Sequence, residues 1–540
     1  MNPRYLGWPP NMPAALDLPA LPATSVLAGS ARRYGDRLAL RHADRTLTFT
    51  ELYQRSCALA HRLTAQGLGR GDVVAVHLPN HVDYPVAYFG TLLAGATAAP
   101  LSPMLRPAEL REQLGVCHAR AVITDVVGDP ITGDGRDGAP RLVWLDPSGR
   151  PDEALDAGRA AAPPTVAVDG DDVAHLVFSG GTTGQPKAVT VLHRNLLAET
   201  LQYACWRTGA LPVPDGQGGV VLDPVEGDYL IRPGQATALT SAPLFHSMGL
   251  VGLSQHVASG TTLITMPRFS ARTFLDLVDE HRVQHLLGAP AMFAGVLEDP
   301  SLHAHDRTSV RAIGCASAPV PPSLTARMLR AFPNARVCQS YGLTEATLVA
   351  TVVPFTRSAP EKPESCGIPL PGTEITLRDG VGAEVATGDV GEIWIRGPQV
   401  TPGYLDRPEA TAAAFVDGWL RTGDLGRLDS DGYLSIAGRL KEMLIYKGYN
   451  VYPAELEELL LRHDAVESAA VVGRPDEAAG ERPVGFVVLR REFSSEEILA
   501  FVNDQVSTVK RLHELHVLDE LPRSPIGKVR KNVLQERLTG

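Results

Sequence analysis

Cysteine is sparse in this 540-residue chain, which contains only six residues of that type. They form no C-x-x-C pair and stand in no histidine-rich cluster, so the sequence has neither a disulfide framework nor a zinc-binding pattern. We therefore expect reduced thiols and a cytoplasmic location. The six residues are Cys57, Cys117, Cys205, Cys315, Cys338 and Cys366.

The chain also has fewer basic than acidic residues. The 50 lysine and arginine residues are outnumbered by 61 acidic residues, which gives a formal net charge of -11. A mildly acidic surface argues against nonspecific nucleic-acid binding, and we expect no nucleic-acid partner. This charge does not exclude anionic ligands, because a few local cations and backbone N–H groups suffice to bind phosphate.

Uninterrupted hydrophobic segments are missing as well. The N-terminal stretch Met1–Val26 lacks the basic start and the apolar run of a signal peptide. One uncharged stretch, Tyr84–Leu105, is long enough to span a bilayer, but prolines and glycines interrupt it. We expect a buried helix followed by a buried strand there, and no membrane span.

The order of the segments predicts the fold class. Segments with strand and helix patterns alternate from Leu38 to Asp125 and again from Val173 to Phe355, which predicts α/β layers with largely parallel sheets. A Gly/Pro/Asp-rich patch, Gly128–Pro151, is typical of a surface loop. The expected elements include strands at Thr46–Thr50, Val73–Leu78, Ala121–Thr124 and Thr261–Met266, and helices at Glu51–Gln66, Pro85–Leu93 and Ala271–His281.

After Ser365 the pattern changes to short strands and glycine turns, which predicts a β-rich subdomain. Further along, Pro453 opens an amphipathic helix, and Ser494 with Glu497 forms a capping box before another helix. We expect an α/β protein with a large N-terminal domain of layered α/β subdomains plus the β-rich subdomain, residues 1–438. A small, mobile α+β C-terminal domain, residues 439–540, would follow a linker near Gly438–Lys441.

One glycine-rich string has the chemistry of a phosphate-binding loop. It follows the apolar strand Ala174–Phe178 and does not fit the Walker A pattern. Its glycines allow backbone N–H groups to approach an anion closely, and its hydroxyl groups and lysine add donors and a positive charge. The residues concerned are Ser179, Gly180, Gly181, Thr182, Thr183, Gly184 and Lys187.

From this loop onward the chain resembles the adenylate-forming superfamily of acyl-CoA synthetases, aryl-CoA ligases, luciferases and peptide-synthetase adenylation domains. The resemblance runs from about Tyr34 to Leu538, and several separate strings match in the right order. They are Pro243–Gly249 (PLFHSMG), Gln339–Glu345 (QSYGLTE), Gly418–Asp424 (GWLRTGD), Gly438–Lys441 (GRLK), Tyr446–Asn450 (YKGYN) and Ser524–Lys528 (SPIGK).

The resemblance implies roles for individual residues in binding ATP and Mg²⁺. Lys528 would contact the α-phosphate and the attacking carboxylate, where negative charge develops. Thr344 and Glu345 would serve the phosphates, with Glu345 as the magnesium ligand. Asp424 would accept the ribose hydroxyls and Arg439 would reach ribose or phosphate. The adenine and phosphates would also contact Ser317, Ala318, Pro319, Gln339, Ser340, Tyr341 and Gly342.

The resemblance also implies sites for the acid and for coenzyme A. His246 would stand in the wall of the acid pocket, and the small residues Gly288, Ala316 and Gly342 would line it. Lys441 occupies the hinge about which the family's C-terminal domain rotates between half-reactions. In the second pose CoA would meet Arg268, Lys447 and Gly448.

Two features depart from typical relatives. Trp206–Gly234 is longer than the corresponding link, and a lid, a partner contact and a surface loop are all compatible with its composition. Ile445 stands where plant aryl-CoA ligases and luciferases carry a second lysine, which disfavours luciferase-type oxidation. The small residues of Gly314–Ala318 and Tyr341–Thr344 indicate an open pocket and do not distinguish aliphatic from aromatic acids.

The primary hypothesis is an AMP-forming acid–CoA ligase that uses a small carboxylic acid, ATP and CoA. A second keeps adenylation but changes the acceptor to an amine, to a carrier-protein thiol or to an inorganic acid such as nitrite. A carrier would be a separate protein, since no carrier segment precedes the end of the chain at Gly540. A noncatalytic acyl or nucleotide sensor is the third hypothesis, and the filled catalytic positions disfavour it.

The two-pose hypothesis makes a prediction about Lys528. Lys528→Ala should slow adenylation by at least ~10²-fold, the effect of losing one donor that stabilises charge in the transition state. Thioester formation from a supplied acyl-adenylate should suffer much less. Rapid-quench assays of the two half-reactions measure both rates, and an equal loss in both would contradict the assignment.

Overall fold

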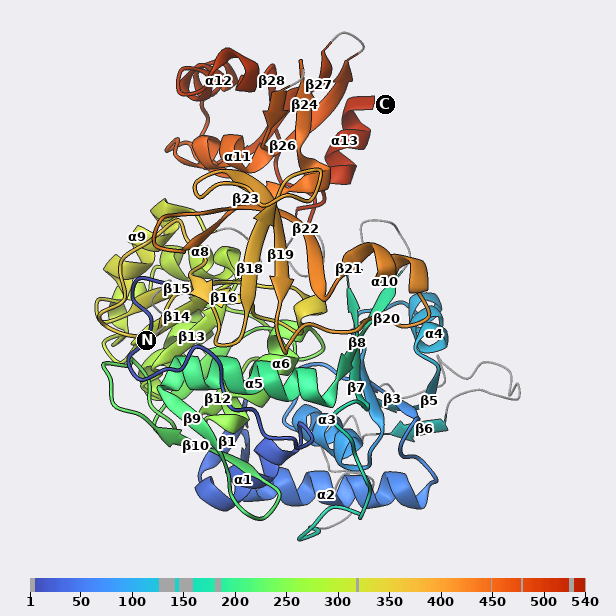
Figure 1. Cartoon of the computed structure of the whole chain (residues 1–540). Coiled ribbons are helices and arrows are strands. Elements are labelled where there is room, and N and C mark those ends of the chain that lie inside the picture. The colour runs from blue at the N-terminus through green and yellow to red at the C-terminus, as the bar shows by residue number, and fades with distance from the viewer. Residues whose placement is uncertain are drawn as a thin grey trace.

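A computed structural model describes residues 5–125, 141–144, 159–179, 186–316, 320–447, 449–476, 479–523 and 529–539, with the backbone alone described for 141–144, 179 and 539. Two large sheets and their helices form the body of the molecule, a β-rich sheet lies above them, and the C-terminal domain lies beyond that sheet (Figure 1). This arrangement confirms the predicted α/β class with a large N-terminal part and a small C-terminal domain.

The first large sheet has seven strands and carries the glycine-rich loop. Its strands β7, β4, β3, β5 and β6 are parallel, whereas β7, β8 and β20 pair antiparallel. In spatial order the strands are β20 (Gly403–Tyr404), β8 (Lys187–Leu192), β7 (Val173–Ser179), β4 (Thr97–Pro100), β3 (Val73–His77), β5 (Ala119–Thr124) and β6 (Arg141–Trp144).

The second large sheet has nine strands and is parallel from β1 to β15, with antiparallel strands at both edges. In spatial order the strands are β17 (Ile368–Pro369), β16 (Thr351–Val352), β15 (Arg336–Tyr341), β14 (Ala312–Cys315), β13 (His285–Gly288), β11 (Thr237–Thr240), β12 (Thr262–Thr265), β1 (Leu38–His42) and β2 (Arg45–Thr48).

Helices cover both sheets and fill the space between them. Thr48 caps α2 in a box with Glu51, which starts that helix two residues before the predicted position. Every residue of α3 is buried, as expected for the uncharged stretch that contains it. These helices are α1 (Ser25–Tyr34), α2 (Phe49–Ala65), α3 (Tyr84–Leu93), α4 (Pro107–Val116), α5 (His193–Thr208), α6 (Ser247–Ala258), α7 (Ala271–Glu280), α8 (Pro290–Glu298) and α9 (Pro322–Ala331), with 3-10 turns η1 (Leu302–Ala304) and η2 (Thr344–Ala346).

Within the long link Trp206–Gly234, residues Ala210–Pro224 form a β-hairpin and not the irregular surface loop that its composition allowed. Strands β9 (Ala210–Pro214) and β10 (Val220–Pro224) pair antiparallel. Arg32 and Arg33 of α1 form ion pairs with Asp215 and Asp223 of the hairpin, which fixes it against the large domain. It lies beside α1, on the side away from the C-terminal domain (Figure 1).

A similar correction applies to Gly128–Pro151, where a surface loop was expected. Residues Arg141–Trp144 form strand β6, which pairs parallel with β5. Residues 126–140 and 145–151 lie outside the described residues.

The β-rich subdomain follows, as predicted. One antiparallel sheet contains β18 (Glu374–Arg378), β19 (Val390–Arg396), β22 (Trp419–Leu428) and β21 (Phe415–Val416), with β23 (Leu434–Arg439) paired to β22. Helix α10 (Pro408–Ala414) precedes β21. The chain between β19 and α10 includes β20, which crosses to the seven-stranded sheet and pairs with β8.

The C-terminal domain is a five-stranded sheet with helices, an α+β unit as expected. Its last helix is fixed by Lys531, whose ammonium group bridges Glu442 (2.9 Å) and Glu457 (2.8 Å). The elements are η3 (Leu440–Glu442), β24 (Leu444–Tyr446), β25 (Tyr449–Val451), α11 (Pro453–Leu461), β26 (Val466–Asp476), β27 (Gly480–Leu489), α12 (Ser495–Asn503), η4 (Thr508–Lys510), β28 (Glu514–Val517) and α13 (Lys531–Thr539).

All six cysteines are free thiols, and five of them are buried. In the part of the chain that the structure describes, no helix combines the length and the apolar character needed to cross a bilayer.

A buried carboxyl group links helices α5 and α6 to the loop that follows η2. Both carboxyl oxygens of Glu199 lie 2.9 Å from the side-chain nitrogen of Gln255, and one of them accepts a hydrogen bond from the N–H of Val349 (3.2 Å). Burial raises the pKa of Glu199 to about 8.

The raised pKa of Glu199 predicts a pH-dependent stability. Between pH 4.5, the ordinary pKa, and pH 8 the folded state binds a proton that the unfolded state has lost. The free energy of unfolding therefore falls as pH rises through this window, by up to about 1.4 kcal/mol per pH unit. Glu199→Gln should remove this contribution, so its melting temperature relative to the wild type should rise from pH 5 to pH 8. A constant difference in scanning calorimetry would contradict the prediction.

Candidate active site

The glycine-rich loop connects two antiparallel strands. Strands β7 and β8 pair from Val173↔Leu192 to Ser179↔Lys187, so the loop leaves and re-enters the sheet at adjacent positions. Lys187, the first residue of β8, is half-buried, and its ammonium nitrogen lies 5.6 Å from the ring centre of Tyr404. Residues Gly180–Gly184 were predicted to bind phosphate, and they lie outside the described residues.

The segment Gln339–Glu345 begins in the last three residues of β15 and continues into the turn η2. Gln339 is buried and donates to the carbonyl oxygen of Pro363 (2.6 Å), while Ser340 pairs with Val352 of β16. A Cβ atom on Gly342 would lie 1.7 Å from the carbonyl oxygen of Leu348, so only glycine fits this position. The segment is thereby held against the next strand, with Thr344 and Glu345 in the turn η2.

Thr344 and Glu345 are held by residues from distant elements. The hydroxyl of Ser247, at the start of α6, donates to Thr344 Oγ1 (3.2 Å). The Tyr404 hydroxyl donates to Glu345 Oε1 (2.8 Å), and the Thr401 N–H and hydroxyl both donate to the Glu345 carbonyl (3.0 and 2.9 Å). Burial, with the Glu345 carboxylate beside it, raises the pKa of Tyr404.

Asp424 joins two sheets at the predicted ribose position. Its Oδ2 accepts a hydrogen bond from the Tyr341 hydroxyl (2.8 Å), and its Oδ1 lies 3.2 Å from Arg439 Nε. Arg439 faces Asp424 across the β22–β23 ladder. These contacts connect the end of β15 to the β22–β23 ladder at Asp424.

The predicted hinge residue Lys441 follows Arg439 in η3. Partial burial, the Arg439 cation and the Lys187 cation lower its pKa, while Asp424 opposes them. Lys441 therefore interacts electrostatically with both Asp424 and Lys187.

Two of the predicted acid-pocket residues, Gly288 and Ala316, lie at the ends of the neighbouring strands β13 and β14. The Ala316 N–H donates to the carbonyl of Gly288 (3.3 Å). A Cβ atom on the buried Gly288 would lie 2.1 Å from the terminal methyl group of Met292, so the Met292 side chain occupies the space beside this glycine. His246 is the N-cap residue of α6, beside Ser247 and hence near Thr344.

The predicted contacts of CoA are more dispersed. Arg268 is exposed after β12, and Lys447 is exposed in the β24–β25 turn with a positive φ of 50°. Ser317, Ala318 and Pro319, Gly448 and the catalytic candidate Lys528 lie outside the described residues.

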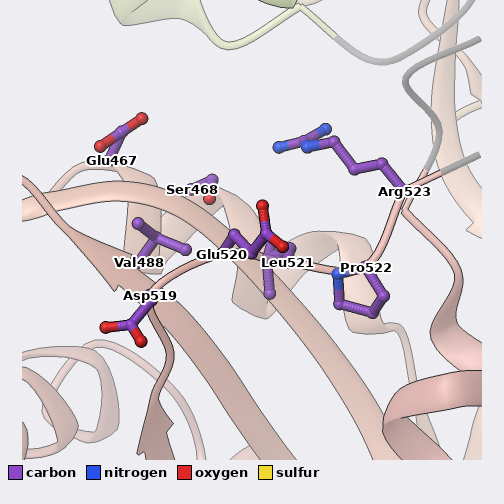
Figure 2. A pocket seen from close by; sticks show the side chains of 8 residues that line it. All are labelled: Glu467, Ser468, Val488, Asp519, Glu520, Leu521, Pro522 and Arg523. Carbon is purple, nitrogen blue, oxygen red and sulfur yellow. The ribbon is translucent and has the colours of Figure 1, made fainter.

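A pocket of about 340 Å³ opens in the C-terminal domain, between β26, β27 and the chain after β28 (Figure 2). Three acidic side chains and one arginine are among its lining residues, and acidic groups disfavour a polyphosphate. We therefore do not assign ATP to it. The lining residues are Glu467, Ser468, Val488, Asp519, Glu520, Leu521, Pro522 and Arg523.

The donor set around Glu345 fits a magnesium ion that binds together with ATP. Among the described residues, no group of three or more His, Cys, Asp or Glu side chains could hold a metal ion. Nucleotide-bound Mg²⁺ takes one or two carboxylates, phosphate oxygens and water. The Tyr404 hydrogen bond uses one lone pair of the Glu345 carboxylate and leaves others for a cation.

Ser247, Thr401 and Tyr404 were missed by the sequence reasoning. Ser247 belongs to the Pro243–Gly249 motif, in which only His246 was predicted to have a role. Tyr404 is separated by 59 residues from Glu345, so no local spacing relates the two.

Comparison with known proteins identifies the family. The model of AMP-binding enzymes matches residues 27–405, and that of the AMP-binding enzyme C-terminal domain matches residues 455–528. A long-chain-fatty-acid–CoA ligase of Bacillus subtilis is 31% identical over 98% of this chain and 97% of its own length. A 4-coumarate–CoA ligase of Pinus taeda is 33% identical over 96% and 95%.

Among solved structures, the o-succinylbenzoate CoA synthetase of Bacillus subtilis, in complex with its acyl-adenylate intermediate, superposes with a TM-score of 0.79 at 29% identity. The superposition covers 95% of this chain and 98% of that one. The resemblance inferred from the motifs is confirmed, and the chain belongs to the family of AMP-binding enzymes.

Proposed function

We propose that this protein is an ATP-dependent, AMP-forming acid–CoA ligase that acts on an apolar carboxylic acid. The enzyme activates the acid with ATP and Mg²⁺ and transfers the acyl group to CoA. The observation that carries the proposal is a pair of contacts between separate parts of the fold: Tyr404 contacts both Lys187 and Glu345, and Tyr341 donates to Asp424.

In the first half-reaction, a carboxylate oxygen attacks the α-phosphorus of ATP and pyrophosphate leaves. Asp424 and Arg439 hold the ribose, and Lys187 with the glycine-rich loop holds the phosphates. Thr344 donates to a phosphate oxygen, and Glu345 would hold Mg²⁺, which supplies charge neutralisation when bound. Lys528 stabilises the charge that develops between the carboxylate and the α-phosphate.

In the second half-reaction, the CoA thiol attacks the acyl carbonyl carbon and AMP leaves. The proposed domain boundary places residues 1–438 in an ATP- and acid-binding domain and residues 439–540 in a mobile domain. Rotation at Lys441 removes Lys528 and brings the Lys447–Gly448 turn toward the site, where Arg268 contacts CoA. Lys441 lies in the turn η3, between the last strand of the β-rich sheet and the first strand of the C-terminal sheet, which supports this hinge.

The small residues near Gly288 and the relatives support the proposed acid class. Gly288, Ala316 and Gly342 carry little or no side chain, and Met292 packs over Gly288, which makes an apolar wall. The relatives named above are ligases for a long-chain fatty acid and for 4-coumarate. An aliphatic or aromatic acid with an apolar body fits both observations.

The location and the partners belong to the proposal as well. The six free thiols support a cytoplasmic protein. A separate carrier protein that delivers its thiol to the CoA position remains an alternative acceptor.

The proposed activity is tested with a panel of aliphatic and aromatic acids, assayed for AMP with and without CoA. AMP and acyl-CoA should form in equal amounts with at least one apolar acid, because each turnover releases one of each. Pyrophosphate release without any consumption of CoA would contradict the CoA acceptor and favour an amine or a carrier protein.

The ribose assignment predicts a loss that depends on the 2′-hydroxyl. Asp424→Ala should lower kcat/KM for ATP by about 10- to 100-fold, the value of a hydrogen bond to a charged group. The loss should be smaller with 2′-deoxy-ATP, which lacks one of the two hydroxyls. Steady-state kinetics with both nucleotides measure the difference.

A matched variant for this experiment is Tyr341→Phe, which removes one hydrogen bond to Asp424 but keeps the carboxylate. It should retain the preference for ATP over 2′-deoxy-ATP. An equal loss with both nucleotides in Asp424→Ala would show that Asp424 does not bind the ribose.

A further inference from the structure

Tyr404 lies between the two charged groups proposed to act on the phosphates. Its hydroxyl contacts the Glu345 carboxylate at 2.8 Å, and its ring centre lies 5.6 Å from the Lys187 ammonium nitrogen. The two contacts use different parts of one side chain. One side chain therefore contacts both the Glu345 anion in turn η2 and the Lys187 cation in strand β8.

The chain around Tyr404 holds Glu345 by its backbone as well. Thr401 donates two hydrogen bonds to the Glu345 carbonyl, from its N–H (3.0 Å) and from its hydroxyl (2.9 Å). Together with the Tyr404 hydroxyl, the segment Thr401–Tyr404 makes three hydrogen bonds to this one residue. Both the backbone and the carboxylate of Glu345 are thereby fixed.

The same segment is fixed to the strand that carries Lys187. Tyr404 pairs with Val189 across the β20–β8 ladder, and the N–H of Leu405 donates to the carbonyl of Ala188 (2.9 Å). The N–H of Tyr404 donates to Thr411 Oγ1 (3.0 Å), at α10. The ring also packs edge-on against Phe415, with the ring centres 6.1 Å apart. These contacts leave the ring little freedom to turn.

We propose that Tyr404 is a positioning residue that orients the Glu345 carboxylate toward the divalent cation bound with ATP and sets its distance from Lys187. This inference rests on the proposed function, which makes Glu345 the metal ligand. A hydrogen bond to one oxygen restrains rotation of the carboxylate and directs its other lone pairs. Partners of this kind typically change metal affinity by about 10- to 100-fold when they are removed.

The test compares ATP binding with Mg²⁺ and with EDTA, by isothermal titration calorimetry in the absence of acid. The ratio of the two dissociation constants reports how strongly the enzyme–ATP complex holds the metal. Tyr404→Phe removes the hydroxyl and keeps the ring over Lys187. It should lower this ratio by about 10-fold, while ATP affinity in EDTA stays within about twofold, because the contact with Lys187 is retained.

Two further variants separate positioning from a general loss of stability. Tyr433→Phe removes a tyrosine hydroxyl that donates to the Leu6 carbonyl (3.0 Å), away from the phosphate-binding residues, and should leave the ratio unchanged. Tyr404→Leu also removes the ring, and should weaken ATP binding in EDTA as well.

Glu345→Gln distinguishes failure of this inference from failure of the proposed function. If Glu345→Gln lowers the ratio but Tyr404→Phe matches the wild type, the positioning role is wrong and the metal assignment stands. If Glu345→Gln leaves the ratio unchanged, Glu345 is not the metal ligand and both assignments fail. A Tyr404→Phe/Glu345→Gln double variant should be no weaker than Glu345→Gln alone, since the hydroxyl acts through Glu345.

Discussion

Two contacts between separate sheets position Lys187, Glu345 and Asp424, the charged residues proposed to bind ATP. Strand β20 leaves the β-rich subdomain and pairs with β8 of the seven-stranded sheet, which places Tyr404 beside Lys187. The Tyr341–Asp424 hydrogen bond joins the end of β15 in the nine-stranded sheet to β22. Without these two connections, the charged groups would belong to separate units and could not act on one nucleotide.

The electrostatics of the site follow from the same arrangement. Glu345 and Asp424 carry the negative charges, and each is paired with a tyrosine hydroxyl that donates without neutralising it. Lys187, Arg439 and Lys441 supply the positive charges, and their mutual repulsion contributes to the lowered pKa of Lys441. Polyphosphate would relieve this repulsion on binding. Negative charge developing at the α-phosphate is then met by groups that are already in place.

Local pattern and motif order predicted much of this architecture. The uncharged stretch before Leu105 is a buried helix and strand, because glycine and proline break it too early for a membrane span. Strand β5 and helix α7 lie within two residues of their expected positions. The motifs contained Lys187, Glu345 and Asp424; the structure joins the first two through Tyr404 and holds the third by a hydrogen bond from Tyr341.

What the sequence did not predict depends on contacts between distant segments. The hairpin β9–β10 packs Val220 and Leu222 into the main hydrophobic core and forms ion pairs with α1, which is more than 180 residues away in the chain. The sequence around Tyr404 gave no reason to single out this residue. Its proposed role depends on the pairing of β20 with β8, which places it next to the strand of Lys187. The buried carboxyl of Glu199 belongs to the same class, since its partners Gln255 and Val349 come from a later helix and a loop.

The central claim is that an acyl-adenylate forms before the acyl group is transferred. It is tested most directly with an acid labelled with ¹⁸O in its carboxylate and with mass spectrometry of the AMP. If the carboxylate attacks the α-phosphorus and the CoA thiol then attacks the carbonyl carbon, one ¹⁸O atom ends up in each AMP. AMP without the label, formed alongside acyl-CoA, would contradict the account.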